Sequence, residues 1–302
     1  MKLFKERILP AFILIIVMPV FIVPIAIFAN EHYQARIYGY VYAFVMLSVL
    51  LYELFTSFKL KWYYATVLTT ISIISIFMPI DNLVALSSPD LNIVPSKYLI
   101  FLKRALFSWE TLIIISVVSL SFFLIELNTL VNMSWGDRVI RLCLMWFSLY
   151  ALIVSIKFIQ ISLYYCWYLA IFLIAAPSVT DIGAFFGGKL FGKKWINKPF
   201  APNVSPKKTW EGFIFGILAG WIFCGGMIFG LNMIEGKIWA QVLLFLLIPF
   251  AATAGDLYYS HLKRLNDVKD YSKILAGHGG LLDRFDSISF AVLLTSIIYA
   301  FV

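Results

Sequence analysis

Acidic, basic and hydroxyl side chains recur at helical spacing in one short segment near the C-terminus. The side chains that would share one helical face, or lie directly beside it, are Asp256, Ser260, Lys263, Asp267 and Arg264. A carboxylate, a hydroxyl and bases on one stripe could bind a phosphate group together with its metal ion. A solvated helix end with local ion pairs has the same spacing, so this segment alone leaves both interpretations open.

A glycine-rich loop follows, and it leads into the last apolar stretch of the chain. Glycines on both sides of His278, including Gly279 and Gly280, let backbone N–H groups approach an anion closely. Asp283 and Asp286 stand one turn apart where the last helix is expected to begin, and a helix N-terminus attracts anions. Helix capping would account for Asp286 equally well, and His278 could shape the loop instead of binding substrate.

A second polar segment lies upstream, directly before another apolar stretch. Its sequence Ser-Pro-Lys-Lys-Thr-Trp-Glu-Gly places Ser205, Lys207 and Lys208 on a proline-containing turn, which could cradle a polyphosphate. The lysines nearer its start, at 193, 194 and 198, could instead anchor the chain on anionic lipid. The chain has neither a Walker A pattern nor a G-x-S-x-G elbow.

The composition indicates whether these polar segments belong to a soluble protein or to a membrane protein. Of the 302 residues, 62% are hydrophobic and 13% are charged, and the mean hydropathy is +0.92. Soluble domains are about 45–50% apolar and about 25% charged, so a soluble enzyme, a nucleic-acid module and a disordered scaffold are excluded. The net charge of +8 is typical of a membrane protein whose cytoplasmic loops collect Lys and Arg, and no nucleic-acid partner is expected.

The chain is therefore predicted to be an all-α, polytopic membrane helix bundle of about nine transmembrane helices. A helix needs roughly 20 apolar residues to cross the bilayer. The expected spans are Ile8–Phe28, Tyr38–Phe55, Trp62–Ile80, Thr111–Ile125, Val139–Ile156, Leu163–Val179, Gly212–Leu231, Ile238–Ala254 and Leu281–Val302. The first is expected to be an uncleaved anchor, because its apolar run exceeds that of a signal peptide.

The distribution of positive charge predicts the orientation of these spans. With a cytoplasmic N-terminus and an external C-terminus, 18 of the 24 Lys and Arg residues face the cytoplasm. Residues 1–160 would then anchor the chain and line a lipid entrance. Residues 161–302 would form the catalytic region, with its polar loops 181–211 and 255–286 on the cytoplasmic face. Asp256 and Asp283 would close the ends of two spans and meet there, in the oxygen-rich setting that Mg²⁺ prefers.

These motifs resemble those of the phosphatidate cytidylyltransferases, or CDP-diacylglycerol synthases. The matching signature positions are Ser260, Leu262, Lys263, Arg264, Lys269, Asp270, His278, Gly279, Gly280, Leu281, Asp283, Arg284, Phe285 and Asp286. Two upstream blocks, 181–188 and 205–212, are also similar, and the resemblance covers roughly residues 170–290. The sequence departs from the family pattern at Tyr259, where a Glu is usual, and at Ala276, where a Pro is common.

The resemblance implies transfer of CMP from CTP to phosphatidate in phospholipid biosynthesis, giving CDP-diacylglycerol and pyrophosphate. It implies Mg²⁺ on Asp256 and Asp283, with room for a second cation, and a catalytic role for Lys263 and Arg264 as well. The substrate-binding residues would be Asp181, Ser205, Lys207, Lys208, Ser260, His278, Gly279, Gly280, Arg284 and Asp286.

The expected partners are CTP, phosphatidate and the lipid bilayer, with a second copy of the chain as a further candidate. The expected location is the cytoplasmic (inner) membrane, with the active site facing the cytoplasm. Two other functions remain open from the sequence: a CTP-dependent polyprenol or phytol kinase, and an ion-coupled transporter. Against the transporter, the acidic residues lie at span ends, and no paired inverted halves are apparent.

Overall fold

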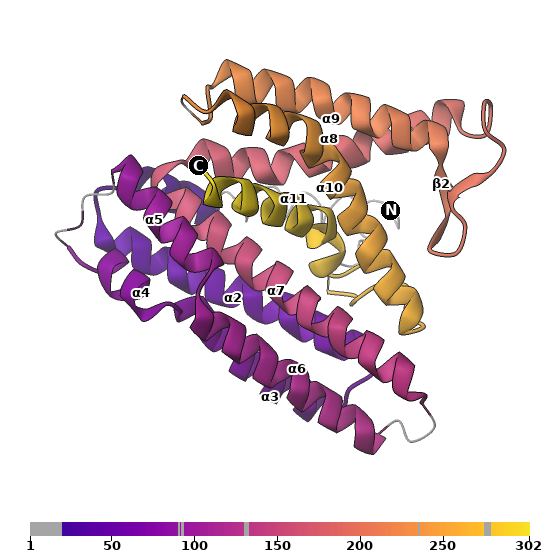
Figure 1. The fold of residues 1–302 in the computed structure, drawn as a ribbon, viewed down its shortest axis with the longest axis horizontal. Helices are drawn as coiled ribbons and strands as arrows, with labels where there is room; N and C mark the ends of the chain where they lie inside the picture. Colours follow the sequence, from indigo (N-terminus) through magenta and orange to yellow (C-terminus); the bar gives the residue numbers. More distant parts are fainter. Residues whose placement is uncertain (1–19, 90, 92–93, 130–132, 235, 275–278) are drawn as a thin grey trace, which may run out of the picture. The chain divides into compact units, whose positions relative to one another are not determined.

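The chain is mostly helical in a computed structural model, which describes residues 20–89, 91, 94–129, 133–234, 236–274 and 279–302 (Figure 1). It divides into two compact units. The N-terminal unit comprises Met1–Tyr165 together with Asp270–Leu282, and the C-terminal unit comprises Cys166–Lys269 together with Asp283–Val302. Each unit is therefore built from two separate stretches of sequence.

The N-terminal unit is a helix bundle held together by large apolar side chains. Its elements are α2 (Tyr33–Ser57), α3 (Trp62–Ile73), the 3₁₀ helix η2 (Ile74–Phe77), α4 (Ile80–Leu86), α5 (Pro95–Leu106), α6 (Trp109–Thr129) and α7 (Trp135–Tyr165). Helix α7 packs against α2, α5 and α6, and α3 packs against α2 and α6. Leu47, Leu50, Leu54 and Phe122 are completely buried and form the centre of this bundle.

The C-terminal unit combines helices with a short antiparallel hairpin. Its elements are α8 (Trp167–Phe191), β1 (Pro199–Ala201), β2 (Ser205–Thr209), α9 (Trp210–Gly230), α10 (Ile238–Leu265) and α11 (Leu282–Ala300), whose first residue belongs to the other unit. In the hairpin, Ala201 pairs with Ser205. Strand β2 leads directly into α9, because the Thr209 hydroxyl accepts a hydrogen bond from the Gly212 N–H at 3.1 Å and caps the helix.

Glycines allow α8 and α9 to pack closely. A Cβ atom added to Gly183 of α8 would lie 2.5 Å from the Cβ of Ala219. One added to Gly216 of α9 would lie 2.9 Å from the Thr180 carbonyl oxygen. Small residues spaced four apart let helix backbones approach each other in membranes, so side chains at these positions would force the two helices apart.

The length and hydropathy of the helices indicate a multi-pass membrane protein. Within the described residues, six helices are long and apolar enough to span a bilayer, and a seventh span results if α3–η2 and α4, bent by 60°, count as one. The first predicted span, Ile8–Phe28, lies mostly outside the described residues. Two predicted boundaries are wrong: α8 continues to Phe191 and α10 continues to Leu265, so neither polar loop begins at the predicted residue, 181 or 255.

Candidate functional site

The C-terminal part of α10 carries the predicted polar stripe. The Ser260 hydroxyl donates a hydrogen bond to Asp256 Oδ1 at 3.2 Å, as expected for side chains one turn apart. Helix α10 ends at Leu265, and Asp267 has a positive φ of 53°. The prediction that Asp267 continues the stripe is therefore wrong, because the chain has already left the helix.

Two predicted catalytic residues meet in a mostly buried ion pair. Lys263 Nζ of α10 lies 2.7 Å from Asp283 Oδ1 in the first turn of α11, with side chains 11% and 7% exposed. Charges with so little access to water require a partner, since desolvating a lone charge is costly. The pair therefore ties the C-terminal end of α10 to the N-terminal end of α11 at the predicted site.

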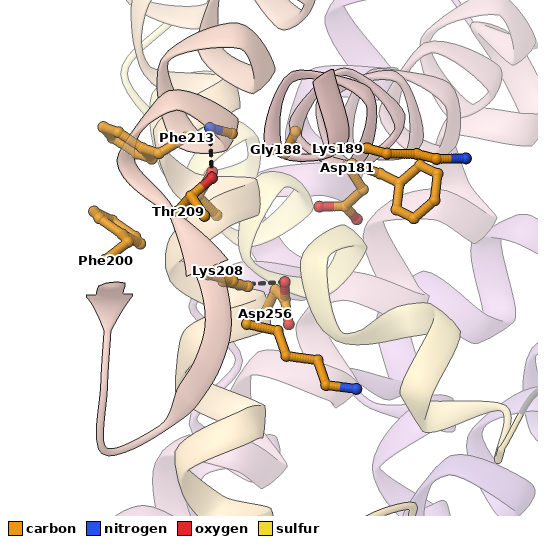
Figure 2. Close-up of a pocket in the computed structure, with 13 residues that line it drawn as sticks. Asp181, Gly188, Lys189, Phe200, Lys208, Thr209, Phe213 and Asp256 are labelled. Atoms are coloured by element: carbon orange, nitrogen blue, oxygen red, sulfur yellow. Dashed lines mark hydrogen bonds and ion pairs between the residues drawn. The ribbon is translucent and has the colours of Figure 1, made fainter. Parts of the chain in front are cut away.

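A second ion pair joins a lysine of the β-hairpin to the other aspartate that was predicted to bind metal. Lys208 of β2 forms an ion pair with Asp256 of α10, and Figure 2 shows the two side chains meeting. Both are about a quarter exposed, so this pair can exchange partners more readily than Lys263 and Asp283. Arg264 Nε donates a hydrogen bond to the Val204 carbonyl oxygen in the hairpin turn at 3.4 Å, so α10 contacts the hairpin at a second point.

A cavity of about 450 Å³ opens beside the Lys208–Asp256 pair (Figure 2). Its wall combines acidic, basic and aromatic side chains, among them Asp181, Asp256, Lys207, Lys208, Phe200 and Phe213. The lysines can neutralise phosphate oxygens, and the aromatic rings can contact a flat or apolar group. The cavity is thus suited to a molecule that carries both phosphate and a less polar part.

Three carboxylates surround this region and interact electrostatically. Asp181 and Asp286 each lie close enough to Asp256 for mutual repulsion, while Lys208 and Arg284 offset the charge of Asp181. The Ser287 hydroxyl donates to Asp181 Oδ2 at 2.9 Å, and the Ser287 N–H donates to Asp286 Oδ1 at 2.7 Å. Such a concentration of negative charge within apolar helices attracts cations.

The remaining predicted residues are distributed as follows. Ser205 begins strand β2, two residues before Lys207. Gly279, with a φ of +80°, and Gly280 belong to the stretch that folds with the N-terminal unit. His278 and the departure at Ala276 lie outside the described residues. At the other departure, Tyr259 is completely buried in α10, so it is a core side chain there.

Sequence reasoning missed two buried glutamates that bind backbone amides. Glu211 in the first turn of α9 is completely buried and accepts hydrogen bonds from the N–H groups of Lys193, Trp195 and Ile196 at 3.1, 2.8 and 2.9 Å. Glu53 lies inside α2 and plays a similar part in the N-terminal unit. The available signal for Glu53 was a single acid within a predicted span, since ionisable residues there are usually functional.

Comparison with known proteins assigns the chain to a family. The family model described as "Cytidylyltransferase family" matches residues 5–302. The chain belongs to the cytidylyltransferase family. The match runs through both units, so the N-terminal helices are part of the family's architecture and not an unrelated extension.

Several curated relatives of this cytidylyltransferase carry the name phosphatidate cytidylyltransferase. The protein of Helicobacter pylori is 43% identical over 123 residues, covering 41% of this chain and 44% of its own length. That of Haemophilus influenzae is 37% identical over 144 residues, covering 46% and 48%. That of Staphylococcus haemolyticus is 29% identical over 221 residues, covering 70% and 80%. The aligned part is thus less than half the length of the first two relatives.

Proposed function

We propose that this cytidylyltransferase transfers a cytidylyl group from CTP to phosphatidate, giving CDP-diacylglycerol and pyrophosphate. The observation that carries the proposal is the cavity beside Asp256, where lysines, carboxylates and aromatic rings from the hairpin and from apolar helices meet. A lipid phosphate and a nucleotide can both reach such a place. The names of the relatives in three genera support the same reaction.

The reaction joins two anions, so charge neutralisation and alignment are its main requirements. An oxygen of the phosphatidate phosphate attacks the α-phosphorus of CTP, and the bond to the β-phosphate breaks with its electron pair leaving on pyrophosphate. Lys207 and Lys208 line the cavity and would bind phosphate oxygens. Arg284, which offsets the charge of Asp181 in the cavity wall, would add positive charge, and Lys263 and Arg264 are proposed to do the same. A phosphate is largely ionised at pH 7, so the chain need not supply a general base.

We propose Mg²⁺ as the cofactor, with Asp256 and Asp283 as its protein ligands. Ammonium groups already stand beside both predicted ligands, Lys208 at Asp256 and Lys263 at Asp283, and mark positions where positive charge is favoured. Among the described residues no group of three or more Asp, Glu, His or Cys could hold a metal ion. Mg²⁺ commonly uses only one or two carboxylates together with substrate phosphates, and when bound it would offset phosphate charge; a second cation remains part of this proposal.

The membrane arrangement in this proposal follows the charge distribution. Nine spans with the N-terminus in the cytoplasm and the C-terminus outside would place the polar segments 181–211 and 255–286, which include helix ends, on the cytoplasmic face of the inner membrane, where CTP is available. Residues 1–160 would then anchor the protein and admit lipid. Single-cysteine labelling in intact cells would test which loops face which side.

The direct test is pyrophosphate release by the purified protein in detergent with CTP, Mg²⁺ and phosphatidate. Asp256→Asn and Asp283→Asn should each lower kcat by at least about 100-fold, because each removes charge that the reacting phosphates or their metal require. Asp267→Asn is the matched control, since Asp267 lies beyond the end of α10, and it should retain activity. Folding of each variant is checked by its melting temperature.

Product analysis separates this reaction from its rivals. A lipid kinase would release CDP and a phosphorylated alcohol, and a transporter would consume no CTP. A folded wild-type protein that turns over no CTP with any phospholipid acceptor would rule out the proposal.

A further inference from the structure

Glu53 is a buried acid one turn before the C-terminal end of the apolar helix α2, and its carboxylate partners among the described residues come from a distant part of the sequence. Its side chain is 1% exposed within α2. Glu53 Oε1 accepts hydrogen bonds from the Ser272 hydroxyl at 2.6 Å and the Leu281 N–H at 3.0 Å, and Oε2 accepts from the Leu282 N–H at 2.7 Å. These partners lie 219 to 229 residues further along the chain and belong to the same compact unit.

The carboxylate also fits the glycine-rich turn sterically. A Cβ atom at position 280 would lie 2.6 Å from Glu53 Oε2 and 2.7 Å from Oε1. A carboxylate held by three hydrogen bonds cannot move aside without breaking them. Gly280 is therefore the residue that lets Glu53 reach the two amides, and Glu53 in turn determines where this backbone runs.

We infer that Glu53 is a positioning residue, which holds the Gly279–Leu282 turn in the conformation that binds substrate phosphate. This inference rests on the proposed function, in which that turn contributes to substrate binding. Glu53 acts through the turn and not by contact with substrate. Its carboxylate accepts hydrogen bonds from the Leu281 and Leu282 N–H groups, and these bonds fix the backbone up to the residue before Asp283. A merely structural acid would stabilise the unit without affecting the use of CTP.

The test compares two buried glutamates of the same unit. Glu53→Gln keeps the volume but puts an NH₂ group where only N–H and O–H donors face it. Glu126→Gln is the matched control, because Glu126 is equally buried, in α6, and binds Arg141 at 2.7 Å instead of the turn. Kinetics of CTP use, melting temperature in detergent, and hydrogen exchange at residues 279–282 are measured for both variants.

Glu53→Gln should lower kcat/KM for CTP by about tenfold or more and accelerate exchange at the Leu281 and Leu282 amides. Glu126→Gln should change neither, whatever it does to the melting temperature. Folded Glu53→Gln with wild-type kcat/KM would overturn the inference. An equal loss in both variants would also overturn it, because the effect would then belong to the unit as a whole.

Ser272→Ala gives a second route if Glu53→Gln does not fold. Ser272 is only partly buried, and its loss removes one of the three restraints on the carboxylate. The expected result is faster exchange at Leu281 and a decrease of about threefold in kcat/KM, and no change in either would contradict the inference. Wild-type protein that releases no pyrophosphate would overturn the proposed function itself, and the exchange rates would still decide whether Glu53 holds the turn.

Discussion

The two compact units pack their helices in different ways. The N-terminal unit fills its centre with large side chains such as Leu47, Leu50 and Phe122, all completely buried. In the C-terminal unit, α8 and α9 meet through glycines, with Gly183 against Ala219 and Gly216 against Thr180 and Ala184. The centre of the first unit therefore tolerates little loss of side-chain volume, and the α8–α9 contact of the second tolerates little gain.

This difference bears directly on the candidate site. Gly188 of α8 and Gly212 of α9 line the cavity that also holds Asp181 and Lys208 (Figure 2). Where backbones lie so close, the helices cannot slide past each other without clashes, so the backbone positions that carry the cavity side chains are fixed. The two helices that carry this part of the cavity wall are thus held by close backbone contact.

The two units nevertheless have one feature in common, a buried glutamate that accepts hydrogen bonds from loop amides. Of the substitutions considered below, removal of Glu211 is expected to have the largest effect on stability and hydrogen exchange. Glu211→Ala leaves the N–H groups of Lys193, Trp195 and Ile196 without their acceptor. Hydrogen exchange at these amides should accelerate by at least about tenfold, and the melting temperature should fall clearly. Glu31→Gln, on the exposed surface, is the control and should change neither.

Glu211→Gln sharpens this prediction. It keeps one oxygen that can still accept from Trp195 and Ile196, so its effect should be smaller than that of Glu211→Ala. If Glu211→Ala protein melts and exchanges like the wild type, the glutamate does not hold the loop and the parallel with Glu53 fails.

A substitution at the glycine contact between α8 and α9 is expected to cause an intermediate loss of stability. Gly216→Leu should destabilise the protein by about 1–3 kcal/mol, because the added side chain overlaps Ala184 and the Thr180 carbonyl. Gly226→Leu in the same helix is the control, since an added Cβ there meets nothing within 4 Å, and it should stay within about 0.5 kcal/mol of wild type. Chemical unfolding in detergent micelles would measure both, and equal effects would refute packing through glycine.

Removal of a helix cap is expected to cause the smallest loss of stability. Thr209 is 8% exposed and caps α9 through the Gly212 N–H, whereas Ser134 is exposed and binds the Asp137 N–H at the start of α7. Thr209→Ala should cost about 1 kcal/mol of stability and Ser134→Ala about 0.5 kcal/mol, because water can replace the exposed bond. The same unfolding measurement applies, and a larger loss for Ser134→Ala would contradict the role of burial.

The parts of the site that were predictable from sequence are those governed by local spacing. Asp256 and Ser260 bond one helical turn apart, as the pattern indicates. Asp267 has the same periodicity but lies beyond the helix end at Leu265, which the i, i+4 spacing alone does not indicate. The start of the upstream polar loop was misplaced for the same reason, since α8 accommodates Asp181 within the helix.

The amino-acid order by itself determined that this is a helical membrane protein with its charged residues gathered in two C-terminal segments, because hydropathy and i, i+4 spacing act over a few turns of chain. Only the tertiary structure decided that Lys208 meets Asp256, that Lys263 meets Asp283, and that Glu53 meets Leu282. Those partners are separated by 20 to 229 residues. Their pairing depends on how helices pack, which no local pattern encodes.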